Sequence, residues 1–285
     1  MTGGHSQGEP GWARVRDGRE LFFQRRSGPA GVPTVVFEGG LAASRSYWAT
    51  VQGELAAWAP SVVYDRSGLG RSPADGRPRR LTRLAQDLGE VLDHLGQGPF
   101  VLVGHSWGGP IVRVAAAAEP GRIAGLVLVD PTDESCDLLF TPSIRRAEKV
   151  GQVGSAALAR LGLLGVAFRG LLASLPADAA ADMRAEGFTV AAMRTRAAEL
   201  ASVEQDLRSL RENTPELGEI PVTVISAGKT SAGMNARVRA LADASHEYRA
   251  SRSSRGRHVH AGLSGHMVPE TEPGLIADEI RRLLS

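Results

Sequence analysis

Ser106 has the sequence context of a catalytic nucleophile. It lies in the run Gly-His-Ser-Trp-Gly that begins at Gly104, between an apolar segment at 100–103 and an Ala-rich segment that begins at Ile111. A Gly-x-Ser-x-Gly turn between a strand and a helix holds the serine in a strained conformation and exposes its hydroxyl at the carboxyl end of a sheet. The flanking glycines allow the strand and the helix to approach closely. The pattern predicts nucleophilic catalysis by Ser106; the alternative is a Gly-rich packing turn.

His266 is the predicted general base. A serine hydroxyl is a weak nucleophile until a base with a pKa near neutrality takes its proton, and histidine suits that task. In proteins with this turn the histidine comes last along the chain. Of the seven histidines, His266 follows the last predicted strand and precedes the C-terminal helix, where a loop can direct the imidazole toward Ser106. His260 is the second candidate, and His105 is expected to pack beside the turn.

Asp130 is the predicted acid that orients the histidine. The usual place for this acid is the loop after the strand at 222–225, but that loop contains no acid before Asp243. Asp130 instead ends the preceding predicted strand, 24 residues after Ser106. The alternative for Asp130 is a turn cap before a proline, which is a common role for aspartate. Asp133, Glu134 and Asp243 remain as reserves.

Two backbone N–H groups are predicted to bind the oxyanion of a tetrahedral intermediate. One is the N–H of Trp107, directly after the nucleophile, and the other is the N–H of Leu41, in the loop after the strand at 34–38. Consecutive glycines at 39 and 40 favour close approach of this loop, although an ordinary Gly-Gly turn is the alternative. Gly40 and the Trp107 side chain are expected to line the substrate pocket.

The elements that carry these residues alternate between strands and helices. Apolar strand patterns at 34–38, 61–65, 100–103 and 125–130 alternate with helical patterns such as 81–95, and the alternation resumes at 222. This order predicts an α/β fold with a mostly parallel central sheet and helices on both faces. We expect a disordered tail at 1–10, a core at 11–132 and 216–285, and an inserted helical cap at 133–215.

Composition limits the partners. With a net charge of +2 among 285 residues, nothing favours a nucleic-acid partner. The single cysteine, Cys136, excludes an intrachain disulfide, and no metal site is predicted.

No secretion signal is apparent in the first ten residues, which predicts a cytoplasmic protein. The apolar stretch 153–175 contains Arg160 and Arg169, which disfavours membrane insertion and favours a cap over an apolar pocket. The sequence leaves open whether the chain forms a homodimer.

These motifs together resemble those of the α/β-hydrolase superfamily, and the likeness extends over nearly the whole chain outside the tail. The matching stretches are 37–41, 64–72, 104–109, 125–131 and Gly265-His266. Two features depart from the usual pattern. Glu38-Gly39-Gly40 replaces the usual His-Gly pair, and the acid is shifted one strand earlier, as in haloalkane dehalogenases and zearalenone lactonases. The former use an Asp nucleophile, so Ser106 disfavours dehalogenation.

The sequence therefore predicts a cofactor-independent serine hydrolase for a small apolar carboxylic ester or lactone. The same triad also serves perhydrolases, cofactor-free haloperoxidases, thioesterases and C–C bond hydrolases, so these remain alternatives. A ligand receptor that retains a vestigial site is an alternative from another class.

Overall fold

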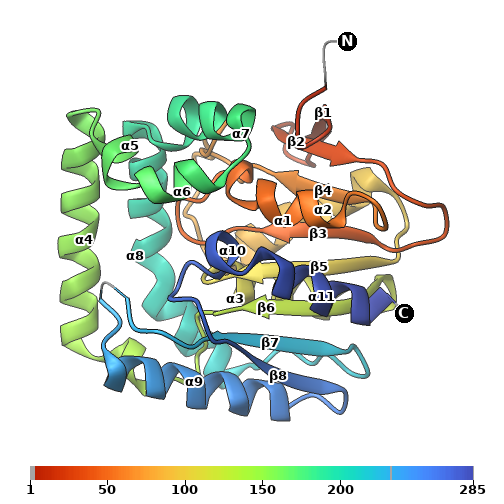
Figure 1. The fold of residues 1–285 in the computed structure, drawn as a ribbon. Helices are drawn as coiled ribbons and strands as arrows, with labels where there is room; N and C mark the ends of the chain where they lie inside the picture. The colour runs from red at the N-terminus through yellow and green to blue at the C-terminus, as the bar shows by residue number, and fades with distance from the viewer. Residues whose placement is uncertain (1–3, 232, 285) are drawn as a thin grey trace.

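An eight-stranded sheet forms the centre of the computed structural model, which describes residues 4–231 and 233–284 (Figure 1). The strand order is β1-β2-β4-β3-β5-β6-β7-β8. Strands β1 and β2 pair antiparallel, as do β2 and β4, and every other neighbouring pair is parallel. The predicted α/β fold class with a mostly parallel central sheet is thus confirmed. The strands are β1 Glu9–Arg14, β2 Glu20–Arg26, β3 Thr34–Glu38, β4 Ser61–Tyr64, β5 Phe100–His105, β6 Ile123–Val129, β7 Val222–Ala227 and β8 Gly256–Ala261.

The two faces of the sheet carry separate hydrophobic cores. In β5, Leu102 belongs to the core on one face, whereas Val101 and Val103 belong to the core on the other, as expected from the alternation of side chains along a strand. The first core packs under α2 (Leu81–Leu95) and α3 (Gly108–Ala118). The second packs under α1 (Ala49–Leu55) and α11 (Pro273–Leu284). Both faces of the central strands are therefore buried.

A group of helices lies between β6 and β7 in the sequence, and Figure 1 shows most of them at the left of the sheet. The apolar stretch at 153–175 is divided among three of these helices, and no helix in the described parts of the chain is both long and apolar enough to cross a bilayer. The inserted elements are α4 Pro142–Arg160, α5 Leu164–Ala167, α6 Arg169–Ser174, α7 Ala177–Asp182, the π-helical turn Met183–Gly187 and α8 Val190–Glu212. We refer to this group as the cap. Besides α1, α2, α3 and α11, the α-helices outside the cap are α9 Ala236–Ser251 and α10 Val268–Thr271.

The N-terminal segment differs from the expected disordered tail. The Ser6 hydroxyl donates a hydrogen bond of 2.6 Å to Asp178, and His5 lies 3.3 Å from Asp182. Gln7 is fully buried, and β1 already begins at Glu9. The prediction was wrong for residues 4–10 because acceptors on α7, far along the chain, satisfy these polar groups. Residues 1–3 lie outside the described residues.

We predict opposite effects of alanine at two helical glycines. A Cβ atom at Gly108 would lie 2.4 Å from the Glu38 carbonyl oxygen, whereas a Cβ at Gly89, inside α2, meets nothing within 4 Å. Gly108→Ala should lower the free energy of unfolding by about 1–3 kcal/mol or more through overpacking. Gly89→Ala should raise it by about 1 kcal/mol through helix propensity. Urea unfolding of both variants checks this, and equal stabilities would contradict the close approach at Gly108.

Candidate active site

Ser106 lies on a sharp turn between β5 and α3. Its φ is 52°, in the left-handed region that a serine rarely adopts. The turn is held on both sides, because the Ser106 N–H donates to Val129 at 3.1 Å and the Ser106 carbonyl accepts from Gly109 at 3.0 Å. A Cβ at Gly104 would lie only 2.5 Å from the carbonyl oxygen of Gly108. The close approach that the glycines were expected to permit is therefore present, and the serine is kept in a strained conformation by its surroundings.

His266 and Asp130 form a direct pair. The distance from His266 Nδ1 to Asp130 Oδ2 is 2.6 Å, although the two residues are 136 positions apart. Asp130 follows β6 with a φ of 39°, and its carboxylate is buried, whereas the imidazole is partly exposed. An ionised carboxylate can only accept, so Nδ1 is the donor. Nε2 of the neutral ring is then the site with a free lone pair.

Arg239, which sequence reasoning missed, also binds the Asp130 carboxylate. Both of its terminal nitrogens contact Asp130, with Nη2 3.0 Å from Oδ2, and Ala227 N donates to Oδ1 at 3.0 Å. Burial alone would raise the pKa of Asp130, but the hydrogen bonds from His266 and Arg239 outweigh it and hold this pKa well below its usual range. Asp130 is therefore a fixed anion. No signal in the sequence singled out Arg239 among the many arginines on helices.

The reserve acids have other partners. Asp133 pairs with Arg249 at 2.6 Å, and Glu134 with Arg113 at 2.7 Å. Burial raises the pKa of Asp133, but its bonds to Arg249 outweigh this and lower it to about 2. Asp243 lies 2.9 Å from His260, the second candidate for the base. In the described part of the chain none of these three acids contacts His266, so the geometry favours Asp130.

The loop after β3 lies against Ser106. A Cβ at Gly40 would be 3.2 Å from the Ser106 Cβ. Arg66 fixes this loop, since its Nη1 donates to the Gly39 carbonyl and its Nη2 to the Gly40 carbonyl, both at 2.7 Å. With the carbonyls held in this way, the N–H groups of Leu41 and Trp107 have no acceptor within residues 4–231 and 233–284. They are free to bind an external oxygen.

The Trp107 side chain does not line the pocket, contrary to expectation. It is 1% exposed and belongs to the core under α2 and α3. The tight turn explains the difference, because it exposes Ser106 and directs the following side chain into the core. Gly40 does line the cavity, as predicted.

His105 contacts the backbone of the loop that carries His266. Its Nε2 donates to the His266 carbonyl at 2.8 Å, and the centroids of the two imidazole rings are 4.7 Å apart. Burial and the proximity of His266 lower the pKa of His105 to about 3. His105 is therefore neutral at physiological pH, in agreement with its expected packing role.

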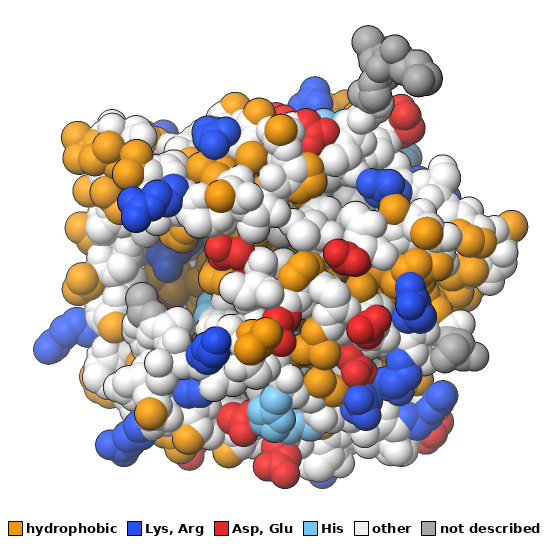
Figure 2. Space-filling model, viewed as in Figure 1, with side chains coloured by type: hydrophobic (Ala, Val, Ile, Leu, Met, Phe, Trp, Pro, Cys, Tyr) orange, Lys and Arg blue, Asp and Glu red, His pale blue; other side chains and the backbone are white. Residues whose placement is uncertain are grey.

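Two cavities meet at Ser106. Both are lined by Ser106, Arg196 and His266. The first, of about 480 Å³, is mainly apolar, and we call it the apolar branch; its lining includes Leu41, Leu164, Phe168, Leu171, Phe188 and Met193. The second, of about 400 Å³, contains more charged groups, and we call it the polar branch; its lining includes Asp133, Glu148, Arg239 and His246. Figure 2 shows this face of the molecule hollowed beside the cap, with a basic side chain inside the hollow.

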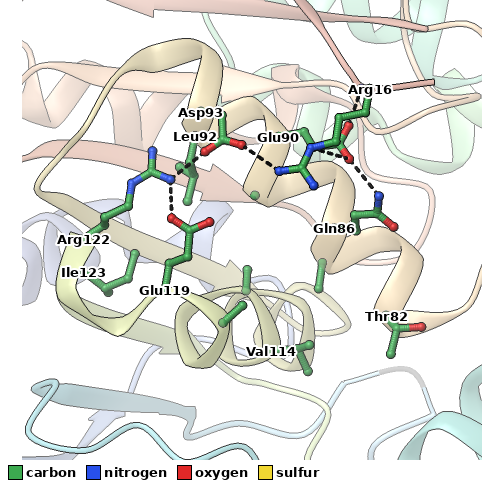
Figure 3. A pocket seen from close by; sticks show the side chains of 14 residues that line it. Arg16, Thr82, Gln86, Glu90, Leu92, Asp93, Val114, Glu119, Arg122 and Ile123 are labelled. Atoms are coloured by element: carbon green, nitrogen blue, oxygen red, sulfur yellow. Dashed lines mark hydrogen bonds and ion pairs between the residues drawn. The ribbon is translucent and has the colours of Figure 1, made fainter. Parts of the chain in front are cut away.

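A further cavity and a cluster of side chains that could bind a metal lie away from Ser106. A cavity of about 270 Å³ between α2 and α3 contains none of the proposed catalytic residues, and Figure 3 shows its charges paired with one another, Arg122 with Asp93 and Glu119. Within the described residues, the one cluster with metal-ligand character is Asp243, His258 and His260. His258 and His260 lie on β8 and Asp243 on α9, and none of the three lines either branch at Ser106.

Comparison with known proteins identifies the family. The model described as alpha/beta hydrolase fold matches residues 33–240. The chain belongs to this family. This family member is 37% identical over 112 residues to the curated protein "Putative carbamate hydrolase RutD" of Caulobacter vibrioides, a match that covers 39% of the chain and 42% of that relative. It is 36% identical over 107 residues to "Lipase LipV" of Mycobacterium tuberculosis, over 38% of the chain and 40% of the lipase.

Matches over the whole length are more distant. An "AB hydrolase superfamily protein" of Gibberella zeae is 28% identical over 93% of the chain and 91% of that protein. Among solved structures, epoxide hydrolase CorEH aligns with a TM-score of 0.73 at 19% identity, over 96% of this chain and 98% of that one. A thermophilic esterase from Thermogutta terrifontis aligns with a TM-score of 0.70 at 20% identity, over 98% and 100%. These structures share the fold of this hydrolase-family chain.

We predict a pH-dependent contribution of His105 to stability. Its folded pKa of about 3 lies below the ordinary value near 6.5, so the unfolded chain binds the proton more tightly and stability is lost as the pH falls through this window. Between pH 7 and 4.5 the loss from this group is about 3 kcal/mol. In His105→Gln the unfolding free energy should fall less over that range. His94→Gln, at the exposed end of α2, serves as the control. Parallel curves for wild type and His105→Gln would contradict the prediction.

Proposed function

We propose that the protein is a serine hydrolase that cleaves a carboxylic ester or lactone through an acyl-enzyme. Ser106 is the nucleophile, His266 the general base and acid, and Asp130 the group that orients His266. The backbone N–H groups of Leu41 and Trp107 bind the oxyanion. The observation that carries the proposal is the 2.6 Å pair of His266 and Asp130 beside cavities that also contain Ser106.

The reaction follows from the free lone pair on His266 Nε2. Nε2 takes the proton of the Ser106 hydroxyl while Oγ attacks the ester carbonyl carbon, and the carbonyl oxygen becomes an oxyanion. The two free N–H groups stabilise that charge, and Asp130 stabilises the imidazolium. The C–O bond to the alcohol then breaks, and the imidazolium gives its proton to the leaving oxygen. Water, deprotonated by Nε2, releases the acid in the same way. A lactone gives a hydroxy acid by these steps.

The support for an ester or lactone is chemical. A histidine whose Nδ1 donates to an ionised aspartate is suited to serine acyl transfer, and the apolar branch accepts an aliphatic or aromatic group. The partial likeness to a named lipase agrees with this class. The partial likeness to a named carbamate hydrolase extends the substrates worth testing to carbamates, which also contain an acyl carbon.

Ser106→Ala should abolish turnover of short 4-nitrophenyl esters, because no other group in the proposed mechanism can form the acyl-enzyme. Removal of a member of such a triad costs a rate factor of about 10⁴–10⁶. Ser143→Ala, at the exposed start of α4, is the matched control and should retain full activity. A fluorophosphonate probe should label wild type and the control but not Ser106→Ala. Undiminished turnover by Ser106→Ala would end the proposal.

Asp130→Asn should lower kcat by about 10²–10⁴-fold, because His266 loses the acceptor that sets its tautomer. The change also leaves Arg239 buried beside a neutral amide, so a loss of about 3–5 kcal/mol of stability is expected and turnover must be measured on folded protein. Asp133→Asn breaks a comparable buried pair with Arg249 and should affect kcat far less. A near-wild-type kcat for Asp130→Asn would move the role to Asp133, Glu134 or Asp243.

A further inference from the structure

Arg196 occupies the junction of the two branches at Ser106. It extends from α8, is half-buried, and lines both the apolar and the polar branch together with Ser106 and His266. The sequence analysis assigned it no role. A side chain that borders both cavities at the nucleophile is placed to contact substrate atoms close to the scissile carbonyl.

Arg196 forms no ion pair with a carboxylate within the described residues. One of its terminal nitrogens, Nη1, donates to the Gln152 amide oxygen, which carries no charge. The other buried arginines near the site do have carboxylate partners: Arg66 binds Glu38 and Glu199, Arg239 binds Asp130, and Arg249 binds Asp133 and Glu134. Arg196 is thus the exception in its surroundings.

The nearest acids are engaged elsewhere. Glu148, one turn before Gln152 on α4, pairs with Arg145 at 2.9 Å, and Glu199 is shared between Arg66 and Arg79. Burial lowers the pKa of Arg196, and the attraction of Glu148 and Glu199 does not offset this. Nε and Nη2 make no hydrogen bond within the described residues and are not enclosed by protein, so they are available to a ligand in the cavity.

We propose that Arg196 binds an anionic group of the substrate, a carboxylate, next to the scissile ester. This inference rests on the proposed function and refines it: the preferred substrate is an ester that carries a free carboxylate, with its apolar part in the apolar branch. A guanidinium presents its donors in a planar fork that matches a carboxylate, and in a partly desolvated cavity such a bond is stronger than in water. The same arginine disfavours substrates that place a cation at this point.

The test compares matched pairs of esters by proton release. In one pair the carboxylate is on the acyl side, as in monoethyl glutarate against ethyl pentanoate. In the other it is on the alcohol side, as in acetoxyacetic acid against ethyl acetate. We expect wild type to show at least a tenfold higher kcat/KM for the anionic member of at least one pair. Arg196→Gln should reduce that ratio at least tenfold, and Arg196→Lys should retain part of it.

Arg194→Gln is the matched control, because Arg194 lies on the same helix but is exposed and lines neither branch. Its ratio should equal that of wild type. Absence of a preference in wild type, or an equal loss on both members of a pair in Arg196→Gln, would overturn the proposal. The equal loss would indicate that Arg196 acts on the oxyanion, which every ester shares.

A binding measurement separates this inference from the proposed function. Glutarate titrated into the Ser106→Ala protein should bind, and the affinity should fall at least tenfold when Arg196→Gln is added. Binding without turnover of any ester by wild type would leave the anion site standing and reject the hydrolase. Turnover without a carboxylate preference, and without glutarate binding, would do the reverse.

Discussion

The buried carboxylate of Asp130 is the point on which the site depends. It accepts from three directions, from His266, from Arg239 and from the backbone of Ala227, while its own backbone is in the left-handed region. Removing an ion from water costs more than a single hydrogen bond returns, so the full set of donors is needed to keep the group charged. That charge orients His266, which lines both branches together with Ser106.

Buried arginines also connect the core to the cap through ion pairs. Arg66 supports the backbone of the loop at 39–40 and at the same time binds Glu199 of α8, so this loop and the cap share one buried cation. Arg45 forms a second bridge, between Asp65 in the core and Asp182 and Glu186 in the cap. Breaking one partner of such a network leaves an uncompensated charge, which favours a single docked position of the cap. Ion pairs between the core and the cap therefore hold the helices that line the cavity at Ser106.

Much of the sheet could be predicted from the sequence, because its strands are buried on both faces and appear as short apolar runs. The pattern at 81–95 matched α2 in its bounds, since apolar spacing and a terminal glycine both mark the helix. The sharp turn at Ser106 was predictable for a similar reason: its glycines are required by contacts local in the sequence. The Trp107 side chain and the segment at 4–10 were not, because their environments are set by tertiary contacts with α2, α3 and α7. Arg239 and Arg196 were missed on the same ground, since an arginine on a helix has the same local pattern whether it faces solvent or a cavity.

The end of β7 and the start of α9 explain how the Asp130 carboxylate is supported. The last residue of β7 contributes a donor and an acceptor: the Ala227 N–H binds the Asp130 carboxylate, and the Ala227 carbonyl accepts from Arg239 at 3.0 Å. Ser226, one residue earlier, links His246 and His258 at 2.8 Å each, and His246 donates to the carbonyl of Pro131, next to Asp130. The end of β7 and the start of α9 thus form the support for a carboxylate on β6. A buried carboxylate after β6 stays charged only if its neighbours supply a countercharge and hydrogen-bond donors. Arg239 and Ala227 meet that condition here.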